Sequence, residues 1–284
     1  MNIPRNFADA RVWLAPAKIN RFLHITGRRS DGYHLLQTLF QFIDLCDELR
    51  FALRADGVIR RVGGPEGLPE EDLCVSAAKR LQALAGVAMG ADIHLTKRIP
   101  MGGGLGGGSS DAATVLVALN ELWGCGLNES ELRALGLELG ADVPVFVFGR
   151  AAWAVGVGET LSEVEPDQPW MLLIDPGCHV DTGLIFTASE LTRDCQSITM
   201  AGFLAGRFSN VCEDVVRSRY PAVDAALDWL DAHGVGGRMT GTGGCVFSGL
   251  DDQHEAQALC RRLPSEWSGF VVKAMNRSPL FERS

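Results

Sequence analysis

The chain has 284 residues, of which 46% are hydrophobic and 21% charged, so it can bury a sizeable core in one large domain or two ordinary ones. Its formal net charge of −9 disfavours general binding to nucleic acid or to an anionic membrane surface. The eight cysteines form no C-x-x-C pair, so we expect reduced thiols and a cytoplasmic location. The sequence has no 18-residue apolar run and no long apolar N-terminal stretch, so we expect neither a membrane span nor a signal peptide.

The predicted elements interleave strands and helices along the whole chain. In the first half they are strands at 11–14, 20–26 and 35–44, a helix at 74–85, a strand at 91–96, helices at 111–123 and 128–139, and strands at 145–148 and 151–155. A polar stretch with prolines at 162–169 then indicates a boundary between domains 1–160 and 161–284. In the second half they are a strand at 171–174, helices at 182–191 and 222–232, strands at 238–240 and 245–248, a helix at 254–263 and a strand at 270–273.

The loop between the strand at 91–96 and the following helix is the most informative segment. It reads PMGGGLGGGSS over residues 100–110, and six of the seven residues from Gly102 to Gly108 lack a Cβ. Glycine lets successive backbone N–H groups turn toward one point, and the helix N-terminus adds unpaired donors and partial positive charge. The loop therefore predicts a nucleotide polyphosphate site made by Pro100, Met101, Gly102, Gly103, Gly104, Leu105, Gly106, Gly107, Gly108, Ser109 and Ser110.

Other glycine-rich loops fit this segment less well. A dinucleotide fold needs an acidic residue about 20 positions on, at the tip of the next strand, but that region is still helical here. A Walker A loop needs Gly-Lys-Ser/Thr, and the segment Gly108-Ser109-Ser110 has no lysine. A protein kinase needs a His-Arg-Asp motif, which is absent. A flexible Gly/Ser linker is disfavoured because a strand and an apolar helix flank the loop so closely.

Three motifs together resemble those of the GHMP kinases, which phosphorylate small alcohols. Pro-x-x-x-Gly-Leu-Gly-x-x-Ser-Ser at 100–110 resembles their phosphate loop, APAKIN at 15–20 their N-terminal motif, and MTGTGGC at 239–245 their C-terminal glycine motif. The resemblance implies an α+β fold of two domains: an N-terminal ATP-binding domain like ribosomal protein S5 domain 2 and a ferredoxin-like C-terminal domain. It places the active site in the cleft between them and implies ATP and Mg²⁺.

Lys18 and Asp142 are the residues that the resemblance places at the transferring phosphate. It implies that Asp142 accepts the hydroxyl proton, that Lys18 keeps this carboxylate ionised and offsets phosphoryl charge, and that Asn20 contacts the substrate. Local sequence leaves ordinary alternatives: a turn or cap aspartate, a solvated lysine and a polar residue at a strand edge. We expect Gly140, in a left-handed cap conformation, and Pro144 to hold the Asp142 carboxylate rigidly.

Two further matches narrow the resemblance to one branch of the family. They are GRRSDGYH at 27–34 and GADVPVF at 140–146. The branch acts on a small-molecule substrate, a cytidine diphosphate-linked methylerythritol. The resemblance thus implies ATP-dependent phosphorylation of its 2-hydroxyl in the non-mevalonate isoprenoid pathway. We expect no nucleic-acid or membrane partner, and a monomer or weak homodimer.

The substrate residues follow from the same matches. The resemblance implies that Tyr33 stacks on cytosine, that His34 hydrogen-bonds the ring edge and that Phe186 closes the stack from the second domain. The Asp31–Gly32 turn would present the first two side chains together. The alternatives are a strand start for the Tyr-His pair and a core position for Phe186. The other substrate-binding residues that it implies are Thr182, Thr240 and Gly241.

On the ATP side, the resemblance implies contacts from Lys97 and from the pair Asp72-Leu73, near adenine. Lys97 has the alternative of a solvated strand end. The family usually has asparagine where this chain has Asp72, and a carboxylate cannot donate an amide proton, so backbone recognition would have to replace that contact. Ser110 is the candidate metal ligand, although it and Ser109 have the alternative of capping the helix.

Two other functions stay open at this point. One is a GHMP kinase for another small alcohol, which would give no reason for the aromatic residues Tyr33 and Phe186. The other is a catalytically inactive nucleotide-binding regulator on the same fold. The presence of both Lys18 and Asp142 argues against the regulator, since a regulator needs no general base.

Overall fold

A computed structural model describes Phe7 and residues 10–282. The strands are β1 (Trp13–Arg28), β2 (His34–Arg54), β3 (Ile59–Arg61), β4 (Gly90–Thr96), β5 (Ala152–Val155), β6 (Thr160–Glu163), β7 (Trp170–Asp175), β8 (Arg238–Met239), β9 (Val246–Leu250) and β10 (Ser268–Met275). The helices are α1 (Leu73–Ala85), α2 (Gly107–Leu122), α3 (Glu129–Leu137), α4 (Val143–Phe148), α5 (Thr182–Thr187), α6 (Met200–Leu204), α7 (Glu213–Arg219), α8 (Pro221–Ala232) and α9 (Gln253–Cys260).

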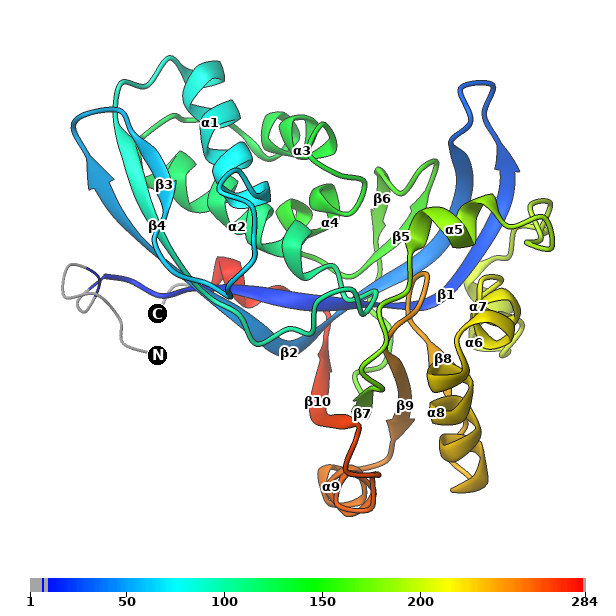
Figure 1. Cartoon of the computed structure of the whole chain (residues 1–284). Coiled ribbons are helices and arrows are strands. Elements are labelled where there is room, and N and C mark those ends of the chain that lie inside the picture. The colour runs from blue at the N-terminus through cyan, green and yellow to red at the C-terminus, as the bar shows by residue number, and fades with distance from the viewer. Residues whose placement is uncertain (1–6, 8–9, 283–284) are drawn as a thin grey trace.

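The long antiparallel hairpin β1–β2 runs through the middle of the molecule (Figure 1). Its register runs from Trp13↔Leu49 at one end to Arg28↔His34 at the other. The turn between Arg28 and His34 is therefore the tip of the hairpin, at the opposite end from Trp13. The sequence predicted shorter, separate strands here. Residues 15–20 are buried on both faces, and such a strand shows no alternation of polar and apolar residues.

One sheet links the two halves of the chain, with the order β3-β4-β2-β10-β7-β9-β8. Strand β10 joins them because it pairs with β2 at Ala274↔Ile43 and with β7 along its length. Helices α1–α4 lie on one face of the first half, and α5–α9 accompany the second (Figure 1). The domain boundary at 160 stays a prediction; it falls at the start of β6, which pairs with β5.

Three of the buried clusters of apolar residues show how this arrangement is held together. One lies between β1, β2 and the helices α1–α4, and a second packs α7–α9 against β7 and β9. A third lies at the junction of the halves and includes Ile19, Leu105, Leu173 and Cys245. The glycine loop is thus anchored by Leu105 in the core shared by the two halves.

The predicted strand at 145–148 is wrong, because these residues form the end of α4. Pro144 lies in the first turn of this helix, where its fixed φ and missing N–H are tolerated. A short, fully apolar run cannot be assigned to strand or helix from periodicity alone. The predicted helix at 182–191 also ends early, at Thr187.

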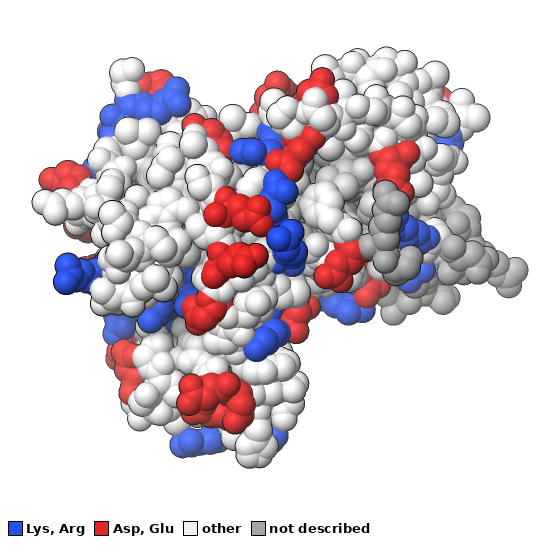
Figure 2. All heavy atoms as spheres, turned by 180° about the vertical axis from the view of Figure 1, so that it is seen from behind, with Lys and Arg blue, Asp and Glu red and all other residues white. Residues whose placement is uncertain are grey.

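Basic and acidic side chains are interspersed on the face of the molecule shown in Figure 2 and do not gather into a patch of one sign. Many of the chain's surface charges form ion pairs, such as Arg150–Glu129 at 2.7 Å and Arg277–Glu163 at 3.3 Å. Among the described residues, no helix has the length and apolar character needed to cross a membrane.

Candidate active site

The glycine loop continues into the first turn of α2. This helix begins at Gly107 and not at residue 111 as predicted, and its N-cap is Gly106 in the left-handed conformation, with φ 69°. Ser109 and Ser110 are therefore inside the helix, and neither caps it. The first-turn N–H groups have no partner within the helix, and they carry its partial positive charge at the loop.

The C-terminal glycine motif holds the loop by backbone contact. The Cys245 N–H donates to the Gly103 carbonyl at 3.1 Å. A Cβ on Gly104 would collide with the carbonyl oxygen of Thr240 and lie 3.0 Å from that of Gly243, and the φ of Gly104 is +75°. Glycine is needed at Gly104 both for this conformation and for the close approach of the two motifs.

A cavity of about 370 Å³ follows the loop. Its lining includes every predicted ATP-binding residue except Ser110, which is fully buried. The residues that line it are Leu68, Asp72, Leu73, Cys74, Leu95, Lys97, residues 100–109 and Asp111.

Lys97 is not a solvated strand end, since its side chain is only 12% exposed. Its ammonium pairs with Asp47 and, at 2.8 Å, with Asp111. Burial raises the pKa of Asp111 to about 7, with a further contribution from the neighbouring Asp47 carboxylate and against the opposing effect of the Lys97 ammonium. Asp47 also accepts hydrogen bonds from the backbone N–H of Arg98 (2.6 Å) and Ile99 (2.9 Å). The cluster thus ties β2 to the segment that enters the glycine loop and to α2.

Asp72 has its carboxylate occupied inside the protein. It caps α1 by accepting from the Val75 N–H at 3.0 Å, and it pairs with Arg61 at 2.7 Å. The residue still lines the nucleotide cavity. A contact between this side chain and adenine is therefore disfavoured, whereas backbone contacts are not affected.

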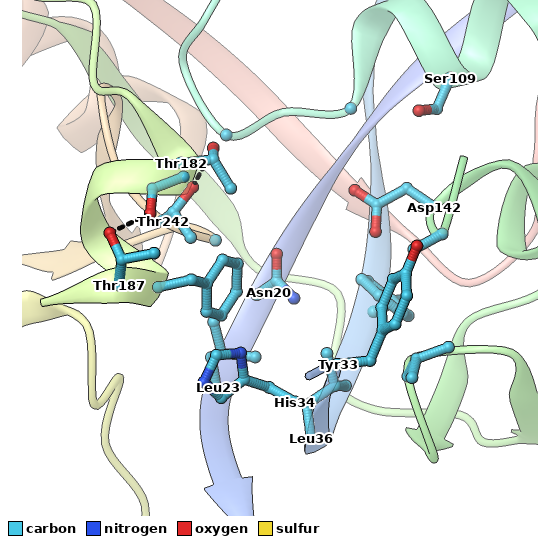
Figure 3. Close-up of a pocket in the computed structure, with 18 of the residues that line it drawn as sticks. Asn20, Leu23, Tyr33, His34, Leu36, Ser109, Asp142, Thr182, Thr187 and Thr242 are labelled. Carbon is cyan, nitrogen blue, oxygen red and sulfur yellow. Dashed lines mark hydrogen bonds between the residues drawn. The ribbon is translucent and has the colours of Figure 1, made fainter. Parts of the chain in front are cut away.

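A second cavity, of about 730 Å³, runs from the glycine loop to the tip of the β1–β2 hairpin (Figure 3). It shares Gly104, Gly106 and Ser109 with the first, so the two cavities meet at the loop. Its lining includes all the predicted catalytic and substrate residues except Thr240: Lys18, Asn20, Tyr33, His34, Asp142, Thr182, Phe186 and Gly241. Thr240 is buried, and its hydroxyl accepts from the Asn20 N–H at 3.0 Å.

Lys18 and Asp142 form an ion pair of 3.2 Å where the cavities meet. The Lys18 side chain is 4% exposed, and its ammonium also donates to Asn20 Oδ1 (2.7 Å) and to the Gly104 carbonyl (2.9 Å). A buried cation with three oxygen partners is fixed in place. The solvated-lysine alternative is therefore wrong.

Asp142 occupies the N-cap position of α4, yet its carboxylate makes no capping hydrogen bond. It pairs instead with Lys18. In Figure 3 the carboxylate lies at the cavity that it lines. The expected left-handed conformation of Gly140 is wrong, because its φ is not positive. Gly140 instead donates its N–H to the Gly136 carbonyl at 3.1 Å, which ends α3 just before Asp142.

The hairpin tip carries the aromatic residues of the second cavity. The Asp31 carboxylate accepts from the Tyr33 N–H at 3.2 Å, and Gly32 has a φ of +94°. Tyr33 is 65% exposed, while the His34 ring stacks on Phe186, with centroids 5.2 Å apart. Phe186 therefore contacts the core and the cavity at once.

Sequence reasoning missed several residues of this cavity. Thr242, within the C-terminal glycine motif, has its hydroxyl 2.7 Å from that of Thr182. Arg28 lies in the GRRSDGYH segment and lines the wall beside the hairpin tip. The motifs contained both residues, but only the fold shows that they face the cavity. Val157 and Thr187 carried no sequence signal.

Comparisons with known proteins agree with this geometry. The model of the GHMP kinases N terminal domain matches residues 72–150, and that of the GHMP kinases C terminal domain matches residues 194–269. A 4-diphosphocytidyl-2-C-methyl-D-erythritol kinase of Nitrosococcus oceani is 54% identical over 272 residues, which is 95% of this chain and 97% of that protein. The chain belongs to this family of GHMP kinases.

Further proteins are similar to this chain in sequence, in structure or in both. The kinase of that name from Alkalilimnicola ehrlichii is 55% identical over 275 residues, covering 96% of this chain and 94% of its own. A crystal structure of a 4-(cytidine 5'-diphospho)-2C-methyl-D-erythritol kinase has a TM-score of 0.81 at 32% identity, covering 93% of this chain and 99% of that one. A mevalonate kinase structure, at 16% identity and a TM-score of 0.71 over 94% of this chain and all of its own, shares the fold. The predicted GHMP kinase fold and enzyme class are confirmed.

Proposed function

We propose that this GHMP kinase transfers the γ-phosphoryl group of ATP to the 2-hydroxyl of 4-diphosphocytidyl-2-C-methyl-D-erythritol, in the non-mevalonate isoprenoid pathway. The observation that carries the proposal is the meeting of two cavities at the Lys18–Asp142 ion pair. The smaller follows a glycine loop suited to a triphosphate. The larger, at about 730 Å³, is within the usual size of small-molecule sites and has aromatic residues at its far end.

ATP and Mg²⁺ fit the residues of the smaller cavity. The first-turn N–H groups of α2 and the glycines around Gly104 leave room for phosphate oxygens beside the main chain. No group of three or more His, Cys, Asp or Glu side chains among the described residues is arranged to hold a metal. Mg²⁺ usually binds through substrate phosphates, waters and one or two carboxylates. Ser110, the metal ligand expected from the sequence, is fully buried and lines neither cavity, whereas the Ser109 hydroxyl lines both and would be the protein oxygen nearest to a phosphate-bound ion. When bound, the ion neutralises charge on the phosphate oxygens.

In our mechanism Asp142 accepts the proton of the substrate hydroxyl. Its carboxylate is partly exposed in the larger cavity, with 34% of the side chain accessible, and it carries no structural hydrogen bond as a helix cap. Lys18 orients this carboxylate and, being held beside the Gly104 carbonyl, lies next to the phosphate loop, where its charge offsets that of the transferring group. Asn20 positions both Lys18 and the substrate.

The nucleobase end of the substrate would lie at the hairpin tip. Tyr33 supplies an exposed aromatic face, Phe186 a second face, and His34 a hydrogen-bonding edge. Thr182, Thr242 and Gly241 line the wall between this end and the loop, where the diphosphate would pass.

The test is to incubate the purified protein with ATP, Mg²⁺ and the cytidine substrate and to identify the product by mass spectrometry. We expect ADP and a product heavier by one phosphoryl group. Homoserine and mevalonate in the same assay give the comparison with other GHMP substrates. Preferential turnover of either would overturn the cytidine assignment and leave a GHMP kinase for another alcohol.

Replacement of Tyr33 by alanine should weaken substrate binding selectively. Loss of one stacking face should cost roughly 1–3 kcal/mol, or about 5- to 150-fold in Kd, whereas Tyr33→Phe keeps the face and should lose much less. ATP affinity should not change, because the triphosphate site lies at the other end of the larger cavity. Calorimetric titration of each ligand measures both effects. Equal substrate affinity in Tyr33→Ala and the unmodified protein would show that cytosine does not stack on Tyr33.

A further inference from the structure

Arg193, which follows α5, contacts both walls of the aromatic end of the substrate cavity. Its Nε–H donates to Nε2 of His34 at 3.2 Å. Its other N–H groups donate to the carbonyls of Leu191 (2.9 Å), Phe186 (3.0 Å) and Ala188 (2.6 Å). One guanidinium thus binds the hairpin tip and the C-terminal end of α5 together. None of the ion pairs among the described residues includes it.

The contact with α5 has a simple physical reason. The last carbonyls of a helix have no partner within it, and they carry partial negative charge. The fork of a guanidinium supplies several donors in one plane and a positive charge. Arg193 therefore fixes the end of α5, and with it the Phe186 ring that lines the cavity.

The contact with the histidine determines which ring nitrogen carries the proton. An arginine Nε–H can only donate, so Nε2 of His34 must accept, and the hydrogen of the neutral ring lies on Nδ1. Two cations, Arg193 and Arg28, face the ring, and burial together with these charges lowers the pKa of His34. The ring is then neutral at pH 7, with Nδ1–H as its one donor.

We propose that Arg193 is a positioning residue that fixes His34 as the Nδ1–H tautomer and thereby selects cytosine over uracil. Cytosine presents an acceptor at ring position 3, whereas uracil presents an N–H at the same position. A histidine with a fixed donor can bond the first and is opposed by the second. The proposal rests on the proposed function, since it assumes that His34 reads the base.

The experiment compares the full-length protein with Arg193→Gln and Arg193→Lys. Glutamine removes the charge and the Nε donor; lysine keeps the charge at the end of α5 but loses the planar fork. The matched control is Arg217→Gln, because Arg217 also pairs within the C-terminal half, with Asp224 at 2.7 Å, but does not line either cavity. Circular dichroism and thermal melts verify that each variant folds.

The first readout is the tautomer of His34, from the ¹⁵N shifts and long-range couplings of its ring in NMR spectra without substrate. We expect Nδ1–H in the unmodified protein and in Arg217→Gln, and a shift toward Nε2–H in both Arg193 variants. Retention of the Nδ1–H form in both Arg193 variants would overturn the proposal. This readout does not depend on what the protein phosphorylates.

The second readout is steady-state turnover of the cytidine substrate and its uridine analogue. We expect Arg193→Gln to raise the KM for the cytidine substrate about tenfold, to leave the KM for ATP and kcat within about twofold, and to reduce the cytidine-to-uridine ratio of kcat/KM by about tenfold. A merely structural role for Arg193 would weaken both substrates equally and leave the ratio unchanged, which would overturn the proposal. Failure of the proposed function is distinct: the unmodified protein would then not turn over the cytidine substrate at all.

Discussion

Asp142→Asn should reduce kcat by roughly 100-fold or more while nucleotide binding stays intact. Asparagine has nearly the same shape as aspartate, but it cannot take the hydroxyl proton. It also leaves the buried Lys18 ammonium without its anionic partner at 3.2 Å. Because the Asp142 carboxylate makes no capping hydrogen bond to α4, the substitution removes the proton acceptor without removing a helix cap. Single-turnover measurement of ADP formation, with ATP affinity from calorimetry, separates the chemical step from binding.

The control for this variant is Asp252→Asn. Asp252 occupies the same N-cap position on α9, where its carboxylate accepts from the Glu255 N–H at 2.8 Å, and asparagine can cap equally well. It should keep full activity and stability. If Asp142→Asn behaved like this control, Asp142 would be a structural residue and a different group would have to accept the proton.

Gly104→Val should weaken ATP binding by about 100-fold or more, because the phosphate loop has to move. The new Cβ would collide with the Thr240 carbonyl oxygen of the C-terminal glycine motif, and valine strongly disfavours a φ of +75°. The Gly104 carbonyl that Lys18 contacts at 2.9 Å would shift as well. The clash is with protein backbone, so the effect on ATP comes from displacement of the loop and not only from a side chain in the phosphate space.

The variant Gly126→Val is the control that separates two effects of valine at Gly104: the strain of a positive φ and the collision of the new Cβ with the Thr240 carbonyl. Gly126 has a φ of +72°, close to that of Gly104, but a Cβ there would have no other group within 4 Å. Both variants should lose stability, by roughly 1–3 kcal/mol from backbone strain, whereas only Gly104→Val should lose ATP affinity. Calorimetric titration with ATP and thermal unfolding measure the two effects. Equal ATP affinity in the two variants would show that the triphosphate does not bind at the glycine loop.

Local sequence was sufficient for the parts of the site that depend on backbone conformation. The glycine loop at 100–108 was predictable because closely spaced glycines beside a helix start have few other uses. The Asp31–Gly32 turn was predictable in the same way, and Gly32 has the positive φ that such a turn needs. Residue roles such as those of Lys18 and Asp142 came from family motifs, and the structure brings these two side chains to within 3.2 Å.

The tertiary structure alone decided what depends on contacts between distant segments. The run that forms α4 was predicted as a strand, since its burial on all sides leaves no periodicity. Lys97 had a solvated strand end as its alternative in the sequence, but it is buried and pairs with Asp47 and Asp111, neither of which local sequence could identify as its partner. Arg193 carried no sequence signal, because its meeting with His34 requires that the hairpin tip lie against the end of α5. A backbone conformation is determined by neighbouring residues, whereas the partner of a charge or a ring nitrogen is determined by how the sheet brings remote segments together.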